Sequence, residues 1–414
     1  MRHIEKPELL APAGSLSKLK VAVDYGADAV YLGGTRLNLR ANADNFTDEE
    51  ILEGIQYAHQ RGRKVYMTLN VIPHNEDMAG LEDYLLKVQA MGIDALIVAD
   101  PGIIMTCREV VPDMELHLST QANNVNYKSA IFWHNTGIKR IVVARELTLE
   151  EIKDLISKIP DTLEIEAFVH GAMCMAYSGR CLLSSYMVGR DANRGECAQP
   201  CRYRYYLVEE KRLEEPMELL EDERGSYIMN SKDMCMIQHI PELMQSGITS
   251  FKIEGRMKSE YYVAAIVKAY RMAIDTYLKD PDNYVYDPKW LELLEKVSHR
   301  KYHTGFYFGR GDSQIYDTAT YVRDYDIVAQ VLEEQADGRY SMLEKNRIFP
   351  GTEVEVLRAE GDLFTTTLTD FKDEEGNAIA VANKAAMNFT CASPDLLKTG
   401  DMIIQAAGDP KKVI

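Results

Sequence analysis

The sequence has no long apolar run and no segment typical of a secretory signal. None of its apolar stretches approaches the ~20 residues that a membrane-spanning helix requires. The first residues, MRHIEKPELLAPAG, are charged and lack the apolar core of a signal peptide. We therefore expect a cytoplasmic protein with no membrane partner, in which thiols stay reduced and disulfide bonds are disfavoured.

Positive charge is also scarce. Lys and Arg number 47 against 64 Asp and Glu, which gives a formal net charge of -17. Nucleic-acid binding usually leaves a basic surface, so an RNA ligand would need a local cluster of basic residues. The acidic residues are concentrated in residues 209–224, which hold eight of them against three basic residues. Such a run is most often a solvated segment.

Several catalytic signatures are missing as well. The chain has no Gly-x-Ser-x-Gly, no His-Glu-x-x-His and no Walker loop, and no Gly-x-Gly-x-x-Gly follows a predicted strand. These absences disfavour a serine hydrolase, a zinc-helix protease and a nucleotide-driven enzyme.

The N-terminal part alternates short apolar runs with amphipathic stretches, which predicts an α/β fold of the (β/α)8, TIM-barrel-like type. The eight expected strands cover residues 7–14, 29–34, 64–70, 95–100, 115–121, 140–146, 164–171 and 250–256. The interval before the eighth strand is far longer than the others. Residues 172–249 are therefore expected to form an insertion at the C-terminal ends of the strands, where such barrels carry their chemistry.

At 414 residues the chain is expected to form two domains. The barrel covers residues 1–280, with its eighth helix at 259–278, and residues 281–322 connect it to a second domain. In residues 323–414, short alternating runs separated by turn signals predict a small all-β barrel. These runs are residues 325–334, 338–344, 352–358, 362–371 and 401–406.

Five of the seven cysteines lie close together in a Gly-rich, polar region. They are Cys174, Cys181, Cys197, Cys201 and Cys235. Only Cys197 and Cys201 have the close spacing of a zinc knuckle, whereas iron–sulfur clusters take thiolates from more irregular loops. The spacing therefore favours iron–sulfur modestly over zinc. Cys107 and Cys391 are most simply core residues.

Polar side chains are expected where the barrel strands end. The candidates for ligand contacts are Arg36, Arg40, Asn70, Gln121, Arg145 and Arg256. Because guanidinium groups grip carboxylates with paired hydrogen bonds, this set favours a small carboxylate-bearing ligand. His170 and Glu254 end the last two strands and are the candidates for proton transfer. Each residue alone has a structural alternative, as an ion pair or a cap, and it is their shared location that favours a site.

One long segment resembles a family signature. Residues 166–184, EAFVHGAMCMAYSGRCLLS, are similar to the signature of the U-thirty-two peptidase family, the collagenase-like proteases. Further similar stretches follow the family order: ELLAPAGSLSKLKVAVDYGADAVYLGG, GRDANRGECAQPCRY, NSKDMC and SFKIEGRMKS. The two-domain length resembles the bacterial tRNA hydroxylation branch of this family.

The resemblance implies a tRNA-modifying enzyme that carries out prephenate-dependent 5-hydroxylation of the wobble uridine. It also implies a 4Fe-4S cluster on Cys174, Cys181, Cys197 and Cys235. Cys201 is then the spare thiol, or it replaces one of the four. The mouth arginines would hold the carboxylates of prephenate. Assembly with further copies, or with a second family member, stays open.

A tRNA would bring its anticodon loop to the barrel mouth, because unpaired bases are reachable without opening a duplex. Basic residues around the cysteine segment and after the last strand are the candidates for RNA contacts. They are Arg194, Arg202, Arg204, Arg256, Lys258, Lys268 and Arg271. Tyr203, Tyr205 and Tyr206 are candidates for stacking on a base.

Two other functions fit parts of the sequence. A peptidase would need a nucleophile, and a cysteine of lowered pKa beside His170 is the nearest candidate. A non-catalytic iron–sulfur scaffold that positions RNA is the third function. Loss of the cluster would then abolish binding rather than turnover.

Overall fold

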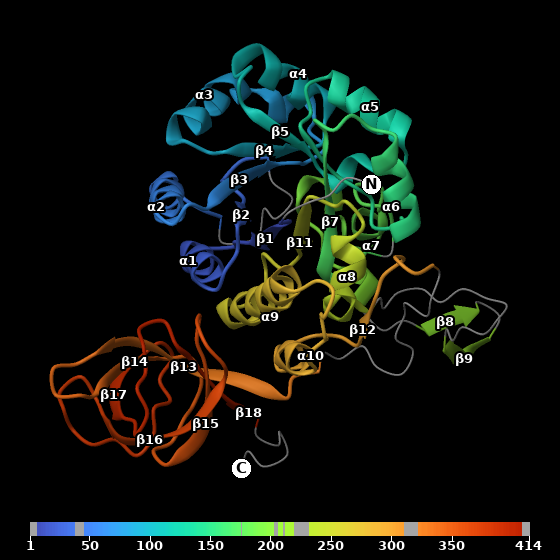
Figure 1. Cartoon of the computed structure of the whole chain (residues 1–414). Coiled ribbons are helices and arrows are strands. Elements are labelled where there is room, and N and C mark those ends of the chain that lie inside the picture. Colours follow the sequence, from blue (N-terminus) through green and yellow to red (C-terminus); the bar gives the residue numbers. More distant parts are fainter. Residues whose placement is uncertain are drawn as a thin grey trace.

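The computed structural model describes residues 6–37, 45–174, 176–202, 206–209, 212–218, 232–309 and 322–407. Eight parallel strands close into a barrel, as the alternating pattern predicted (Figure 1). They are β1 (Glu8–Pro12), β2 (Ala29–Leu32), β3 (Lys64–Leu69), β4 (Ala95–Val98), β5 (Glu115–Leu118), β6 (Arg140–Val142), β7 (Glu164–Ala172) and β11 (Ser250–Ile253). Pairing of β11 with both β1 and β7 closes the ring.

Helices cover the outside of this barrel (Figure 1). They are α1 (Leu16–Asp24), α2 (Asp48–His59), α3 (Leu81–Met91), α4 (Pro101–Val110), α5 (Tyr127–Asn135), α6 (Leu149–Ser157), α8 (Ile240–Met244) and α9 (Glu260–Lys279). Capping boxes at Thr47 and Thr148 satisfy free backbone N–H groups and fix where α2 and α6 begin. None of the helices in the described part of the chain is both long and apolar enough to cross a bilayer.

Buried charges fill the barrel at the N-terminal ends of its strands. Arg140, the first residue of β6, lies 2.5 Å from Glu8, 2.7 Å from Glu164 and 3.4 Å from Glu166. Lys252 Nζ lies 2.6 Å from Glu166. Burial raises the pKa of Glu166, but Lys252 and Arg140 outweigh it, so the pKa lies below its usual value. Because this end is filled, a ligand has to enter from the C-terminal ends.

The insertion after β7 returns to the barrel sheet. It contains α7 (Leu183–Val188), η3 (Ala192–Arg194), η4 (Pro200–Arg202), β8 (Tyr206–Glu209), β9 (Arg212–Glu218), β10 (Asp233–Cys235) and η5 (Ile237–His239). Strand β10 pairs antiparallel with the end of β7, and β12 (Tyr302–His303) pairs with β10. Strands this short have no visible periodicity, and the sequence analysis did not predict them.

The C-terminal region forms a closed antiparallel barrel, which confirms the predicted all-β fold (Figure 1). Its strands are β13 (Tyr325–Glu334), β14 (Tyr340–Glu344), β15 (Thr352–Leu357), β16 (Phe364–Lys372), β17 (Asn388–Ala392) and β18 (Met402–Ala406), of which only β17 was not predicted. Lys268 Nζ on α9 donates to the carbonyls of Arg358 (2.7 Å) and Gly361 (2.6 Å). These bonds connect the second barrel to α9 of the first. The helix α10 (Lys289–Glu295) also packs on α9.

Candidate active site at the barrel mouth

Most of the predicted ligand residues meet at the C-terminal end of the barrel. Asn70, Gln121, Arg145, Glu254 and Arg256 each follow the end of a strand. Asn70 Nδ2 donates to Ser119 Oγ (3.2 Å), whereas Asn70 Oδ1 is buried and accepts no hydrogen bond from the described residues. Because buried polar atoms are normally hydrogen-bonded, this open acceptor marks a place for a donor on a ligand.

Arg145 is held over the mouth by three contacts. It donates to the Ala172 carbonyl (2.8 Å), its Nη2 lies 3.3 Å from Glu254 Oε2, and its guanidinium lies 3.9 Å from the centre of the Phe168 ring. Its Nε is buried and has no hydrogen-bond partner within the described residues. Arg145 therefore has a fixed position at the mouth and one buried donor that the described residues leave unsatisfied.

Two close backbone approaches position the other charged groups. Arg256 is buried and donates to Thr68 Oγ1 (3.2 Å). A Cβ on Gly14 would lie 1.9 Å from the Arg256 carbonyl, so only glycine fits there. Gly171, at φ +109°, leaves no room either, because a Cβ would lie 2.5 Å from the carbonyl oxygen of Glu254. These glycines therefore determine how closely the end of β11 approaches its neighbours.

Arg36 has a structural role. Its guanidinium donates to the carbonyls of Ala79 (2.6 Å) and Gly80 (3.0 Å) and lies over the Tyr84 ring. It thereby ties the loop after β2 to the start of α3, and these carbonyls compete with any ligand for its donors. Arg40 lies outside the described residues.

His170 does not reach the mouth. Its ring is 1% exposed and lies against Tyr262, Tyr270 and Tyr302, which belong to α9 and β12. Burial lowers its pKa to about 3, so the ring is neutral. The register between β7 and β11 shifts beside it, and one extra residue turns the ring from the barrel interior toward α9. Of the two proton-transfer candidates, the structure brings only Glu254 to the mouth.

The clustered cysteines are all free thiols but occupy two environments. Cys174 is exposed, and Cys181, Cys197 and Cys201 are half-buried in the segment after β7. Cys235 is buried on β10, where burial raises its pKa to about 12 and Tyr270 is a hydrogen-bond neighbour. No group of three or more Cys, His, Asp or Glu in the described part of the chain is placed to hold a metal ion. The accessible thiols fit iron–sulfur ligation by their chemistry, whereas Cys235 is buried beside Tyr270.

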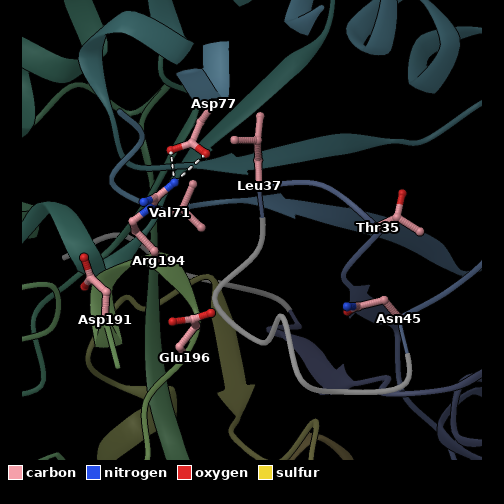
Figure 2. A pocket seen from close by; sticks show the side chains of 8 residues that line it. All are labelled: Thr35, Leu37, Asn45, Val71, Asp77, Asp191, Arg194 and Glu196. Atoms are coloured by element: carbon pink, nitrogen blue, oxygen red, sulfur yellow. Dashed lines mark hydrogen bonds and ion pairs between the residues drawn. The ribbon is translucent and has the colours of Figure 1, made fainter. Parts of the chain in front are cut away.

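A pocket of about 310 Å³ lies between the insertion and the loops after β2 and β3 (Figure 2). It is lined by Thr35, Leu37, Asn45, Val71, Asp77, Asp191, Arg194 and Glu196. Arg194 Nη2 lies 2.9 Å from Asp77 and 3.0 Å from Glu76, so its charge is compensated. The remaining acids, Asp191 and Glu196, disfavour a carboxylate ligand. The central mouth, and not this pocket, suits such a ligand.

The other predicted RNA contacts divide into two groups. Lys258 donates to the Ser298 carbonyl (3.1 Å), Arg271 pairs with Asp28 (3.0 Å) and Lys268 docks the second barrel, so all three make internal contacts. Arg204, Tyr203 and Tyr205 lie outside the described residues. For Arg202 and Tyr206, only the backbone is described.

Sequence reasoning missed three residues that build the mouth. Thr68 holds Arg256, Ser119 holds Asn70, and Phe168 supports Arg145. A hydroxyl on an otherwise apolar strand, as in KVYMTLN, was the available signal for Thr68. In contrast, Cys107 and Cys391 are buried, as predicted for core residues.

Comparisons with known proteins cover both barrels. The model of peptidase family U32 matches residues 14–316, and the model of its C-terminal domain matches residues 323–403. The chain is 46% identical over 381 residues to tRNA hydroxylation protein P1 of Bacillus subtilis, which covers 91% of this chain and 90% of that protein. It is 39% identical over 419 residues to tRNA hydroxylation protein P of Escherichia coli, 91% of each chain. A collagenase of Porphyromonas gingivalis is 36% identical over 317 residues, 73% of this chain and 74% of that protein.

The fold and the mouth define a two-domain barrel protein with charged and polar side chains gathered at the C-terminal ends of its strands. The two family matches then identify it further. The chain belongs to peptidase family U32, as the signature around Cys174 and Cys181 indicated.

Proposed function

We propose that this protein modifies tRNA by hydroxylating the wobble uridine at C5, with prephenate as cosubstrate. The observation that carries the proposal is the 46% identity to a tRNA hydroxylation protein over 91% of this chain. That similarity extends through both barrels. Replacing C5–H by C5–OH is a two-electron oxidation of the base, so the reaction also needs an oxygen donor and an acceptor for two electrons.

The mouth offers groups that complement a dicarboxylate with a hydroxyl group. Among the described residues, Arg145 and Arg256 place guanidinium groups there and would bind the carboxylates. The open Oδ1 of Asn70 would accept from the hydroxyl, and Gln121 lines the same mouth. Glu254, 3.3 Å from Arg145, is the group placed to transfer a proton.

We assign the 4Fe-4S cluster to Cys174, Cys181, Cys197 and Cys235. The strand that bears Cys235 pairs with the end of β7, from which the segment with the other thiols continues. Such a cluster, when bound, supplies one-electron transfer.

Cys235→Ser tests this assignment, with Cys201→Ser as the matched control. We expect the Cys235 variant to lose iron and acid-labile sulfide after anaerobic purification, and the Cys201 variant to keep both. The reverse result would assign Cys201, which lies on the same segment as the other three thiols.

The reaction is tested with purified protein, tRNA that lacks the modification, and prephenate. We expect 5-hydroxyuridine at the wobble position by mass spectrometry of the nucleosides. Hydroxylation that is unchanged without prephenate would remove prephenate from the function. Binding of tRNA without any hydroxylation would favour the scaffold.

A peptidase is the second candidate, because a collagenase is 36% identical over 73% of the chain. The thiol–imidazole pair that sequence reasoning suggested for it does not suit nucleophilic attack. His170 pairs with Cys235 across the strands, and burial raises the pKa of that thiol to about 12. Gelatin hydrolysis that is retained in Cys235→Ser and lost in Arg145→Gln would support a peptidase whose active site lies at the mouth.

A further inference from the structure

The segment between β7 and η3 carries an exposed surface that none of the contacts above explains. We define the α7 face as Tyr186 of α7 together with four residues that precede or follow this helix in the chain, Tyr177, Arg180, Leu182 and Arg190; all five are exposed. Tyr186 is 91% exposed and Leu182 is 69% exposed, which is unusual for side chains of this size. The other side of α7 packs on η3 and η4 and buries Ser184. The packing of α7 on η3 and η4 therefore determines which side of the helix faces solvent.

The charge of the α7 face is opposite to that of the chain. Residues 167–190 contain no Asp or Glu, although the chain has 64 acidic residues in 414. Neither Arg180 nor Arg190 makes a side-chain ion pair or hydrogen bond with the rest of the described chain. Arg194, a few residues on, is compensated by two carboxylates. The positive charge of the α7 face is therefore available to a ligand.

The α7 face begins at the mouth. Asn123, which follows β5, donates to the Ser178 carbonyl (2.8 Å). A Cβ on Gly179 would lie 3.1 Å from Gln121 Oε1, so the segment passes directly over that mouth residue. The chain therefore runs from the mouth, at Ser178 and Gly179, directly to α7.

We propose that the α7 face binds the single-stranded RNA bases that flank the modified uridine. This inference rests on the proposed function, because it names the surface that receives the loop of the tRNA. Exposed tyrosines stack on bases regardless of sequence, and the two arginines meet the phosphates between them. A loop of unpaired nucleotides supplies both partners, and the lack of acidic residues removes the repulsion that the rest of this chain would impose on RNA.

The test measures binding of an anticodon stem-loop RNA by fluorescence anisotropy. Tyr186→Ala should weaken binding about 10-fold, the range of one base–aromatic stack. Tyr186→Phe should bind as the wild type, and Tyr186→Leu should be as weak as the alanine variant, because it keeps apolar bulk without a ring. Since Tyr186 is 91% exposed, its removal leaves the fold intact, which thermal unfolding verifies.

The arginines are tested through salt dependence. Arg180→Gln and Arg190→Gln should each reduce the slope of log affinity against log salt by about 0.7, as one lost contact to a single-strand phosphate does. Phe132→Ala on α5 and Arg61→Gln, just before β3, are matched controls on other exposed surfaces and should change neither quantity.

Two results would overturn the inference without touching the proposed function. One is wild-type affinity for the RNA in Tyr186→Ala, while the wild-type protein binds and hydroxylates tRNA. The other is a changed oligomeric state of Tyr186→Ala in sedimentation with unchanged RNA affinity, which would make the α7 face a protein contact. A wild-type protein that neither binds nor hydroxylates tRNA would overturn both.

Discussion

Charged residues have different surroundings at the two ends of the barrel, as a comparison of Arg140 with Arg145 shows. Arg140, at the start of β6, is surrounded by Glu8, Glu164 and Glu166, all within ion-pair distance. Arg145, just after the end of the same strand, has one carboxylate neighbour and a buried Nε without a partner in the described part of the chain. The first arginine is fully compensated by the protein, whereas the second keeps a donor that the described residues leave unsatisfied.

This difference separates stability from function along a single strand. Charges buried at the closed end stay paired, since an uncompensated charge there would destabilise the fold. Open donors and acceptors at the mouth are tolerated because a ligand can satisfy them. Substitutions at the closed end should therefore mainly reduce stability, whereas substitutions at the mouth should mainly reduce activity.

Arg140→Gln should have the largest effect, and that effect should be on stability. Removing the guanidinium leaves Glu8 and Glu164 without a cationic partner among the described residues and leaves Glu166 with Lys252 alone, which should lower the free energy of unfolding by about 3–5 kcal/mol. Urea denaturation measures the loss. A variant that unfolds like the wild type would mean that the ion pairs of Arg140 do not stabilise the barrel.

Acidification should weaken the same network. The pKa of Glu166 is held below its usual value of 4.5 in the folded state, so the unfolded chain takes up protons first. Its contribution to stability is complete above pH 4.5 and is lost as the pH falls further through the folded-state pKa. The free energy of unfolding should fall less steeply with decreasing pH in Glu166→Gln than in the wild type. Equal slopes would contradict the ion pairing of Glu166.

Arg145→Gln should instead reduce activity. We expect kcat/KM for prephenate to fall about 100-fold, the scale of charge-assisted bonds to one carboxylate, with a smaller loss of stability than in Arg140→Gln. Arg145→Lys should recover only part of the activity, because an ammonium group cannot bind a carboxylate in the paired geometry. Equal losses of stability in Arg140→Gln and Arg145→Gln would mean that the two ends of the barrel contribute equally to stability.

Gly171→Ala should reduce activity about 10-fold by pushing the backbone at Glu254 away from its position. Gly92→Ala is the matched control, since Gly92 also has a positive φ but no atom within 4 Å of a Cβ. Both variants should lose similar stability from backbone strain, and only Gly171→Ala should lose turnover. Equal activity in the two variants would mean that Glu254 does not need its observed place.

His170→Phe should have the smallest effect on chemistry, within about threefold in kcat. The ring lies among tyrosines away from the mouth, and a phenyl group preserves that packing. Glu254→Gln, assayed beside it, should lose far more activity. A His170→Phe variant as inactive as Glu254→Gln would restore the histidine as the proton-transfer group.

The barrel was predictable because each of its strands is a short apolar run bounded by Gly, Asp or Asn. The same reasoning could not find β10 or β12, because two or three residues have no period and their pairing partners lie far away in the sequence. Strand β17, NFTCA, buries only two side chains, Phe389 and Cys391, and has no apolar run to mark it.

The site was predictable in place but not in detail. Strand ends gave Asn70, Gln121, Arg145, Glu254 and Arg256, because parallel strands of a barrel end at one mouth. Arg36 was misplaced because the carbonyls that bind it come from a loop about forty residues later. His170 was misplaced because one extra residue between two strands reverses a side chain, and no sequence pattern reveals that shift.

The account is tested most directly by the wobble nucleoside of substrate tRNA after reaction with wild-type protein and with Arg145→Gln, each with and without prephenate. We predict 5-hydroxyuridine by mass spectrometry only with wild-type protein and prephenate together, and a trace with Arg145→Gln. Full hydroxylation by Arg145→Gln, or hydroxylation by the wild type that does not depend on prephenate, would contradict a carboxylate-binding active site at the mouth.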